Sequence, residues 1–581
     1  MDVDYELKLN CDDELPVIYM RVRLDSTKAR RVSLTGFVDW VMGAHTSRLT
    51  RAYAQGGMAL CEGDMPGVGW CAYVETDGEI CLNLLDFLGT DGDRAQPGAM
   101  KRARLNPKNA LQATSPCGAV RIYESLRPGE TLERTFAIGW ARSADEARQT
   151  LSSLRAWSPA IRARRSLENW RARLERLSFD TPDNALNVML NQWLPYQTQV
   201  SRIWARAGYY QPGGAYGFRD QLQDMLALID TDPAQVRAHI LRCAAHQFED
   251  GDVQHWWHEP YRGVRTHISD DMLFLPYVTA LYAEHTGDDN ILEETVPFLK
   301  NVSIPDGAED IYTECEPSDD RGTLREHCLR AIRRADTRGI HGLPLMGAGD
   351  WNDGMNRVGA KGKGESVWLS EFMVVCAEEY AAVSPEQGDA AWLRETANAF
   401  RSAIEKSAWD GEWYLRAFYD DGTPLGSRQN AECRIDGISQ AWAVLAGLDS
   451  ARCRSAMNAA WNQLVDEEHG VIRLLAPPFT PEGRDPGYIR GYPEGVRENG
   501  AQYTHAACWF LLALIRMGDE ARAHRALRML IPETHADTRE KLMRYRVEPY
   551  VVPADVYAGI HAGRGGWTWY TGSASWLYIC V

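Results

Sequence analysis

The chain has 581 residues, which is too many for one ordinary compact core and predicts two or more domains or one large closed toroid. Its net charge of −17 comes without a run of Lys or Arg that could follow a phosphate backbone, which argues against a nucleic-acid partner. The 13 cysteines contain no CxxC pair and no secretory apolar region opens the sequence, so we expect reduced thiols in a cytoplasmic protein. No apolar run approaches the roughly 20 residues that cross a bilayer, and no membrane segment is expected.

The N-terminal quarter of the sequence has the alternating pattern of β-strands. Segments such as PVIYMRVRL and RRVSLTGFVDWVM alternate apolar and polar residues and are separated by turn residues, which predicts antiparallel β-structure up to about Trp140. At Ser143 the period becomes helical, with Ser143 as the expected N-cap and Glu146 near the capping-box position. A helical linker is therefore expected after the strands.

Beyond Pro182 the long periodic segments are helical and come in pairs. Examples are RDQLQDMLALI with AQVRAHILRCAAHQF, and SVWLSEFMVVCAEEYAAV with AWLRETANAFRSAIEK. Repeated helix pairs predict an α/α barrel or a solenoid. The loops between the pairs concentrate Gly, Trp, Arg, Asp, Glu and His, so loops that gather on one rim would form a polar, aromatic pocket above an apolar ring of helices.

The segment GDWNDGMN, residues 349–356, places two carboxylates in a very short turn. A calcium loop does not fit, because Gly354 arrives one residue early and no Glu closes the loop. One interpretation is a helix-entry turn in which Asp350 or Asn352 caps backbone N–H groups. The other is that the closeness of Asp350 and Asp353, beside Trp351, keeps one carboxyl protonated near neutral pH, as a general acid requires.

Other polar segments also have both a structural and a functional interpretation. Arg219 and Asp220 either form an ion pair or present donors and an acceptor to sugar hydroxyls. The histidines of HWWHE, residues 255–259, match neither HExxH nor HxxEH, so we expect hydrogen bonds to neighbours or substrate rather than a metal site. Glu498 and the later His505 are either a base with an orienting residue or a helix cap with a core histidine.

The last segment, GGWTWYTGS at residues 565–573, suits an anion at a helix start, although many helix starts share this composition. Taken in order, these segments resemble the inverting glycoside phosphorylases of the cellobiose and chitobiose phosphorylase family. The resemblance runs from about residue 5 to the end and is carried by YYQPGGAYGFRDQLQD, GDVQHWWHE, RTHISDDMLFLPY, GDWNDGMN, YPEGVRENGAQYTHAA and EPYVVPADVY. It is closest to the branch that acts on β-1,2-glucans, which comprises β-1,2-oligoglucan phosphorylases and the C-terminal part of cyclic β-1,2-glucan synthases.

The resemblance implies a mainly helical fold in three parts. These are a truncated antiparallel β-sandwich over residues 1–142, a helical linker over 143–181 and an (α/α)6 barrel over 182–581. In the family the sandwich normally begins further upstream, and a small β-domain normally follows the TGSASW helix. Family members often dimerise through the sandwich domain, so a homodimer is also expected.

The resemblance also implies the residues that hold the sugar. Asp353, the second aspartate of DWND, matches the proton donor of the family, and Trp351 would lie beside the bound sugar. Arg219, Asp220 and Glu498 match positions that contact the sugar that is transferred. Cellobiose-type members carry an arginine in the loop before the Arg-Asp pair, whereas this loop reads QPGGAYGF, which argues against cellobiose as the substrate.

A phosphate site is implied in the same way, because His505, Thr571 and Gly572 match the positions that hold phosphate. Asp353 would protonate the glycosidic oxygen of a β-linked gluco-oligosaccharide while phosphate attacks the anomeric carbon from the opposite face and gives α-glucose 1-phosphate. Phosphate replaces the base of an inverting hydrolase, and no metal or organic cofactor is expected. Two alternatives stay open: an inverting hydrolase that uses Glu498 or Asp270 as the base, and a noncatalytic glycan-binding remnant.

Overall fold

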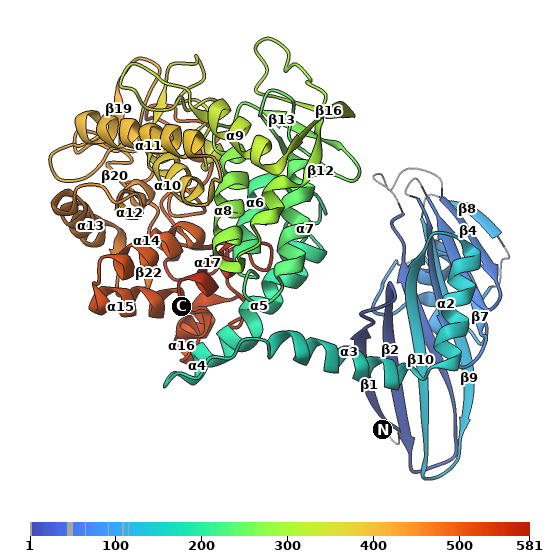
Figure 1. Cartoon of the computed structure of the whole chain (residues 1–581). Helices are drawn as coiled ribbons and strands as arrows, with labels where there is room; N and C mark the ends of the chain where they lie inside the picture. Colours follow the sequence, from blue (N-terminus) through green and yellow to red (C-terminus); the bar gives the residue numbers. More distant parts are fainter. Residues whose placement is uncertain (1–2, 43–49, 64–65, 91, 107–109, 114) are drawn as a thin grey trace. The chain divides into compact units, whose positions relative to one another are not determined.

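The structure is a computed structural model that describes residues 3–42, 50–63, 66–90, 92–106, 110–113 and 115–581. The chain forms two compact units, Met1–Arg173 and Leu174–Val581 (Figure 1). The first unit contains the strands β1 to β10 and the helix α2 (Ala144–Ala156), and its boundary falls near the end of α3 (Pro159–Leu174). The second unit contains the helical pairs.

The first unit is built from two antiparallel sheets. Within the described residues, the larger sheet has the order β1-β2-β10-β6-β5-β4-β8 and the smaller one β3-β9-β7. Their strands are β1 (Val3–Cys11), β2 (Val17–Ser26), β3 (Arg30–Asp39), β4 (Thr50–Gln55), β5 (Met58–Glu62), β6 (Val68–Tyr73), β7 (Glu79–Asn83), β8 (Ala110–Ala113), β9 (Pro116–Leu126) and β10 (Glu130–Ala141).

The central strands of the larger sheet are covered on both faces, to which successive side chains of a strand point in turn. On one face, Trp70 of β6 packs in a cluster with Leu151 of α2. On the other face, Tyr73 of β6 and Phe136 of β10 pack with Val120 of the smaller sheet. Consequently every residue of the central strand β6 is buried, and the sequence VGWCAY is apolar or small throughout.

The second unit is a ring of paired helices. Within the described residues, each of six inner helices contacts the next, and the last contacts the first: α6 (Phe218–Leu226), α8 (Phe274–Thr286), α10 (Val367–Val383), α12 (Gly437–Leu445), α14 (Thr504–Arg516) and α17 (Ser573–Ile579). Outer partners follow most of them along the chain: α7 (Pro233–Ala244), α9 (Leu324–Ala335), α11 (Gln387–Ser407), α13 (Ser450–Leu464) and α15 (Glu520–Leu530). The short α5 (Leu194–Gln197) contacts α17.

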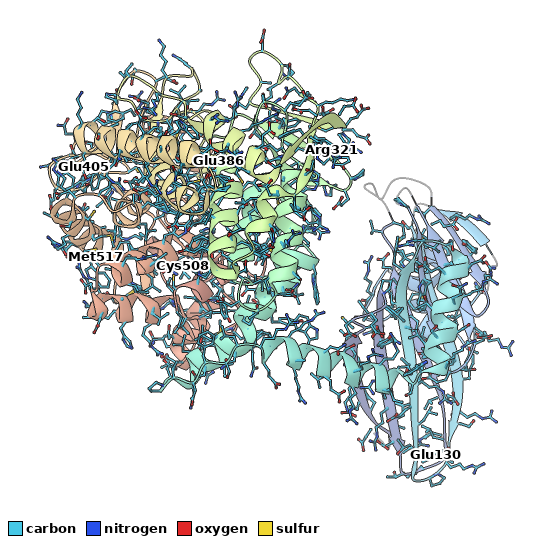
Figure 2. All side chains as sticks on the ribbon, viewed as in Figure 1. Glu130, Arg321, Glu386, Glu405, Cys508 and Met517 are labelled. Atoms are coloured by element: carbon cyan, nitrogen blue, oxygen red, sulfur yellow. The ribbon has the colours of Figure 1, made fainter. Side chains whose placement is uncertain are left out.

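Burial separates the inner helices from the outer ones. The inner α10 is mainly apolar and is buried over most of its length. The outer α11 buries a single stripe that includes Leu393, Ala397, Phe400 and Ile404, the spacing of one helix face. Figure 2 labels Cys508, which is fully buried on the inner α14, and Glu386, which is exposed just before α11.

The cysteine side chains lie mainly in the interior of the protein. All 13 cysteines are free thiols, and each of them except Cys11 is buried. Among the described residues, no helix is both long enough and apolar enough to cross a membrane.

Candidate active site

A cavity of about 540 Å³ lies at the N-terminal ends of the inner helices. Its walls come from the segments that precede α6, α8, α10, α14 and α17, although these segments are far apart in the sequence. All eight residues predicted to form the site line this cavity: Arg219, Asp220, Trp351, Asp353, Glu498, His505, Thr571 and Gly572.

A tight turn brings Asp353 to the cavity. Gly349 has a φ of +128°, which favours glycine because other residues rarely adopt it. Three residues later in the turn, the Asn352 side chain accepts a hydrogen bond of 3.0 Å from the Gly354 N–H, as a helix N-cap does. Asp353 therefore opens the 3-10 turn η6 (Asp353–Met355) with a side chain that is 33% exposed to the cavity.

Asp350, by contrast, points away from the cavity and is fully buried. Arg416 donates to both of its carboxylate oxygens at 2.6 Å, and Ser366, the N-cap of α10, donates to Oδ2 at 2.6 Å. Burial alone would raise the pKa of Asp350, but the Arg416 charge outweighs it and lowers that pKa. Asp350 thus has its own cation, and of the two aspartates only Asp353 lines the cavity. Asp350 Oδ1 also accepts a hydrogen bond of 3.0 Å from the Asn352 N–H, which confirms the turn interpretation of this segment.

Arg219 links the turn that carries Asp353 to a buried acidic cluster. Its Nη2 donates to Asp353 Oδ1 at 2.5 Å, and its Nη1 donates to Asp270 Oδ1 at 2.6 Å and to the Asp350 carbonyl at 3.1 Å. Asp271 Oδ1 lies 3.5 Å from Arg219 Nε. Arg219 and Asp220 thus do not form the simple ion pair that was one interpretation of the sequence, because Arg219 faces these other carboxylates.

Asp220 instead faces Arg202, which sits in the π-helical segment η3 (Thr198–Trp204). Arg202 donates to Asp220 Oδ1 at 3.2 Å and to Asp224 Oδ2 at 2.8 Å, and its guanidinium lies 4.2 Å from the centre of the Tyr570 ring. Asp220 and Asp224 are one helical turn apart on α6, so a single arginine reaches both. The Asp220 side chain lines the cavity and is 45% exposed, so it can accept hydrogen bonds from a ligand.

Glu498 lines the cavity beside Arg497. Its carboxylate lies 3.5 Å from Arg497 Nε, and Oε2 has no hydrogen-bond partner within the described part of the chain. Burial raises the pKa of Glu498 despite the charge of Arg497. Arg497 itself has a φ of +55°, and its guanidinium lies 4.5 Å from the centre of the Trp567 ring.

The protonation of His505 follows from its neighbours. Burial lowers the pKa of His505 to about 3, so the ring is neutral. Trp576 Nε1, which can only donate, is 2.9 Å from Gln223 Oε1, and the same oxygen is 2.9 Å from His505 Nε2. This network assigns the ring hydrogen to Nε2, which leaves His505 Nδ1 as an acceptor.

Gly572 lies against that acceptor. A Cβ atom at Gly572 would come 3.1 Å from both Nδ1 and Cε1 of His505, so only glycine leaves the ring its present space. Thr571 Oγ1 accepts from the Ser573 N–H at 3.2 Å and lies 2.7 Å from Ser573 Oγ. His505, Thr571 and Gly572 thus form one polar end of the cavity.

Two family models divide the chain in the same way as the structure. The model of the catalytic domain of the glycosyl hydrolase 94 superfamily matches residues 169–581, and the model of the glycosyl hydrolase 94 supersandwich domain matches residues 2–156. The chain belongs to the glycosyl hydrolase 94 superfamily. This membership confirms the family resemblance seen in the motifs.

Relatives in the superfamily include a synthase and several phosphorylases. The chain is 42% identical to a cyclic β-(1,2)-glucan synthase of Rhizobium meliloti, over 97% of this chain and 20% of the relative. It is 31% identical to a solabiose phosphorylase of Paenibacillus borealis, over 85% and 61%, and 25% identical to a 1,2-β-oligoglucan phosphorylase of Listeria innocua, over 66% and 36%. The chain therefore spans less than two thirds of the length of each of these relatives.

A solved structure shares the fold of this glycosyl hydrolase 94 chain. A bacterial glucoamylase in complex with acarbose superposes with a TM-score of 0.65 at 10% sequence identity, covering 100% of this chain and 81% of the glucoamylase chain. At this identity the likeness concerns the fold alone.

Several cavity residues of this superfamily member were not singled out from the sequence. Arg202 and Arg497 line the cavity together with the aromatic residues Tyr488, Tyr492, Tyr503, Trp567 and Tyr570. The sequence does contain an indication of such a cation: Asp220 and Asp224 place two carboxylates on one face of α6, and buried carboxylates are usually paired with a positive charge. The two histidines of HWWHE also line the cavity: His255 hydrogen-bonds to Asp271 at 2.8 Å, and His258 to the Gly213 carbonyl at 2.9 Å.

Proposed function

We propose that the chain catalyses the reversible, inverting phosphorolysis of β-linked gluco-oligosaccharides and releases α-glucose 1-phosphate. One observation carries this proposal: Asp353 and the polar end formed by His505, Thr571 and Gly572 line one cavity. A general acid and an anion site in the same enclosed space are what phosphorolysis needs. Phosphorylases and a glucan synthase among the relatives support this class of activity.

The scaffold for this reaction is, in our proposal, an (α/α)6 barrel preceded by a β-sandwich. The closed ring of inner helices, the outer partners and the glucoamylase likeness support the barrel. Such a ring delivers the N-terminal ends of its inner helices to one side, where the cavity-lining segments are found.

The first part of the reaction positions and protonates the sugar. Asp220 and Glu498 accept hydrogen bonds from hydroxyl groups of the glucosyl unit, and Trp351 offers it an apolar surface. Trp351 is 8% exposed, and its ring packs against Tyr503 and Trp509. Asp353 gives a proton to the glycosidic oxygen as the bond to the anomeric carbon breaks.

Phosphate supplies the nucleophile from the opposite face. The unprotonated Nδ1 of His505 accepts the hydrogen of a monoprotonated phosphate, while the Thr571 hydroxyl and the backbone at Gly572 contact its other oxygens. A phosphate oxygen then forms a bond to the anomeric carbon as the glycosidic bond breaks. Attack from the face opposite the leaving group inverts the β-linkage to the α-phosphate.

The β-1,2 linkage is the finer part of the proposal. Two relatives carry β-1,2-glucan in their names, the glucan synthase at 42% identity and the oligoglucan phosphorylase at 25%. In our proposal, the part of the cavity beyond Asp353 selects the hydroxyl group of the acceptor and the length of the glucan chain.

An inverting hydrolase would need a carboxylate that activates water. Asp270 is fully buried behind Arg219, and burial raises its pKa. Glu498 lines the cavity, but its carboxylate lies 3.5 Å from Arg497 Nε, and in our proposal it binds a hydroxyl group of the sugar rather than water. These features favour phosphate over water as the second reactant.

NMR analysis of the products tests the proposal directly. The protein is incubated with β-1,2-gluco-oligosaccharides with and without inorganic phosphate, and then with β-1,3- and β-1,4-linked substrates. We expect α-glucose 1-phosphate only in the presence of phosphate and only from the β-1,2 substrate. Free glucose in both samples would identify a hydrolase, and the absence of any product from folded protein would refute the enzymatic proposal.

The variant Asp353→Asn tests the proposed role of Asp353 as the general acid. It should lower the rate on ordinary glycosides by about 10²- to 10⁴-fold, because asparagine cannot transfer a proton, and should change sugar binding far less. Asp319→Asn is the matched control, since Asp319 is exposed on β16 (Pro317–Thr323) outside the cavity. Full activity of Asp353→Asn would show that another group is the acid.

A further inference from the structure

His255 stands between two aspartates at the edge of the proton-donor turn. It lies on β12 (Gln254–His258), lines the cavity, and is 15% exposed. Its Nδ1 is 2.8 Å from Oδ2 of Asp271, which is buried at the start of the turn η4 (Asp271–Leu273). Its Nε2 is 3.7 Å from Oδ2 of Asp353. One ring nitrogen is thus anchored, and the other faces the proposed acid.

The two oxygens of Asp353 are not equivalent. Oδ1 accepts a hydrogen bond of 2.5 Å from Arg219, which does not release its protons near neutral pH. The oxygen that can carry a transferable proton is therefore Oδ2. The ring nitrogen of His255 lies on that side, 3.7 Å away, and a shift of about 0.5 Å would bring the pair within hydrogen-bond distance.

The charges around His255 come from several elements. Asp271 of η4 and Asp353 of η6 face it with negative charge, as does Asp220 of α6, whereas Arg219 of α6 is the opposing cation. Burial lowers the pKa of His255, but the charges of Asp271 and Asp353 outweigh burial and Arg219 and raise that pKa to about 9. At neutral pH the ring accordingly holds a proton on both nitrogens.

We propose that His255 donates the proton that Asp353 passes to the glycosidic oxygen, and that Asp271 positions the ring for this transfer. The inference rests on the proposed function. Arg219 donates to Oδ1 of Asp353, and His255 Nε2 lies 3.7 Å from Oδ2, so His255 is placed to supply the proton on that side. A sugar that displaces water from this pair removes solvent from the charged imidazolium, which favours transfer of its proton to Asp353.

The proton balance is simple. His255 Nε2 gives its proton to Asp353 Oδ2, and Asp353 gives a proton to the glycosidic oxygen as the bond to the anomeric carbon breaks. A phosphate oxygen forms the new bond to that carbon, and the sugar phosphate releases its remaining proton to solvent. Neutral His255 then takes up one proton from solvent, so the enzyme returns to its starting state without a further reactant.

His255→Gln tests this role, because glutamine can still donate a hydrogen bond but cannot transfer a proton. Phosphorolysis of a β-1,2-linked disaccharide is compared with that of 2,4-dinitrophenyl β-glucoside, whose leaving group departs without protonation. We expect kcat on the disaccharide to fall by about 10²-fold or more and kcat on the activated glucoside to change by less than about threefold. Equal losses on both substrates, or a change confined to KM, would overturn the proposal.

The pH profile supplies a second readout. In the wild type, kcat on the disaccharide should fall as pH rises through about 9, where His255 loses its proton. Asp271→Asn removes the charge that holds this proton and should move that alkaline limb to lower pH, which keeps the proposal testable if His255→Gln does not fold. An unchanged limb in folded Asp271→Asn protein would contradict the proposal.

His469→Gln is the matched control. His469 also contacts a carboxylate, Asp466 at 3.0 Å, but it does not line the cavity. Its rates and pH profile should equal those of the wild type. A wild-type protein that forms no α-glucose 1-phosphate would refute the proposed function and this role together, whereas an active wild type with an unaltered His255→Gln profile would refute only the role of His255.

Discussion

The buried ion pair of Arg416 and Asp350 should make a large contribution to the stability of the turn that carries Asp353. Both side chains are 0% exposed, and two hydrogen bonds of 2.6 Å join them. Arg416→Met leaves the Asp350 carboxylate in the core without its cation. We expect the free energy of unfolding to fall by about 3–5 kcal/mol, the range for breaking a buried pair by removing one partner.

Urea unfolding followed by tryptophan fluorescence measures this loss, because most of the 20 tryptophans lie in the helical unit. Arg484→Met is the matched control: Arg484 pairs with Asp421 at 2.9 Å on the surface, so its loss should be at most about 1 kcal/mol. The double variant Asp350→Asn with Arg416→Met should recover part of the loss, since neither charge is then buried alone. A loss below about 1 kcal/mol for Arg416→Met would refute the reasoning.

The contribution of the Arg416–Asp350 pair to the free energy of unfolding depends on pH in a direction that follows from the pKa of Asp350. The pKa of Asp350 is lowered in the folded protein, so its contribution to stability is present above the ordinary aspartate pKa and is lost as pH falls through the folded value. The difference between wild type and Arg416→Met should therefore be full near pH 7 and should shrink below roughly pH 4. A difference that grows on acidification would contradict the assignment of Asp350 as the ionised partner.

Three further variants test other parts of the site. Gly572→Ala should raise the phosphate KM, because the added methyl group would come 3.1 Å from the His505 ring; initial rates at varied phosphate measure this. His505→Ala should raise the phosphate KM far more than the sugar KM, and equal effects would place His505 outside the phosphate site. Arg202→Met should destabilise the protein by about 3–5 kcal/mol in urea unfolding, since it leaves buried Asp224 without its cation.

Much of the fold could be predicted from local periodicity. Helices α10 and α11 were recognisable as a pair because one is mainly apolar and the other carries a single apolar stripe. Sheet order could not be predicted in this way. Strand β10 pairs with both β2 and β6, and Phe136 lies opposite Met20 on one side and Tyr73 on the other. Such pairings join distant segments, and alternation within a strand does not encode them.

Motifs predicted the candidate residues that line the cavity, whereas their partners could not be predicted in this way. The ion pair between Arg219 and Asp353 joins residues 134 positions apart, and that between Arg416 and Asp350 joins residues 66 positions apart. Each of these arginines stands in a segment whose local pattern does not reveal its partner. Closure of the helix ring brings them together, so only the three-dimensional structure shows which carboxylate receives which cation.

Asp350 and Asp353 show why this distinction matters for chemistry. The two side chains are identical and three residues apart, and the sequence alone allowed either to be the acid. In the structure, Asp350 has both oxygens occupied by Arg416 and has no access to the cavity, so a proton on it could not reach a substrate. Asp353 keeps one oxygen free on the side of His255. The availability of that oxygen, rather than the closeness of two acids, is what makes Asp353 suited to proton transfer.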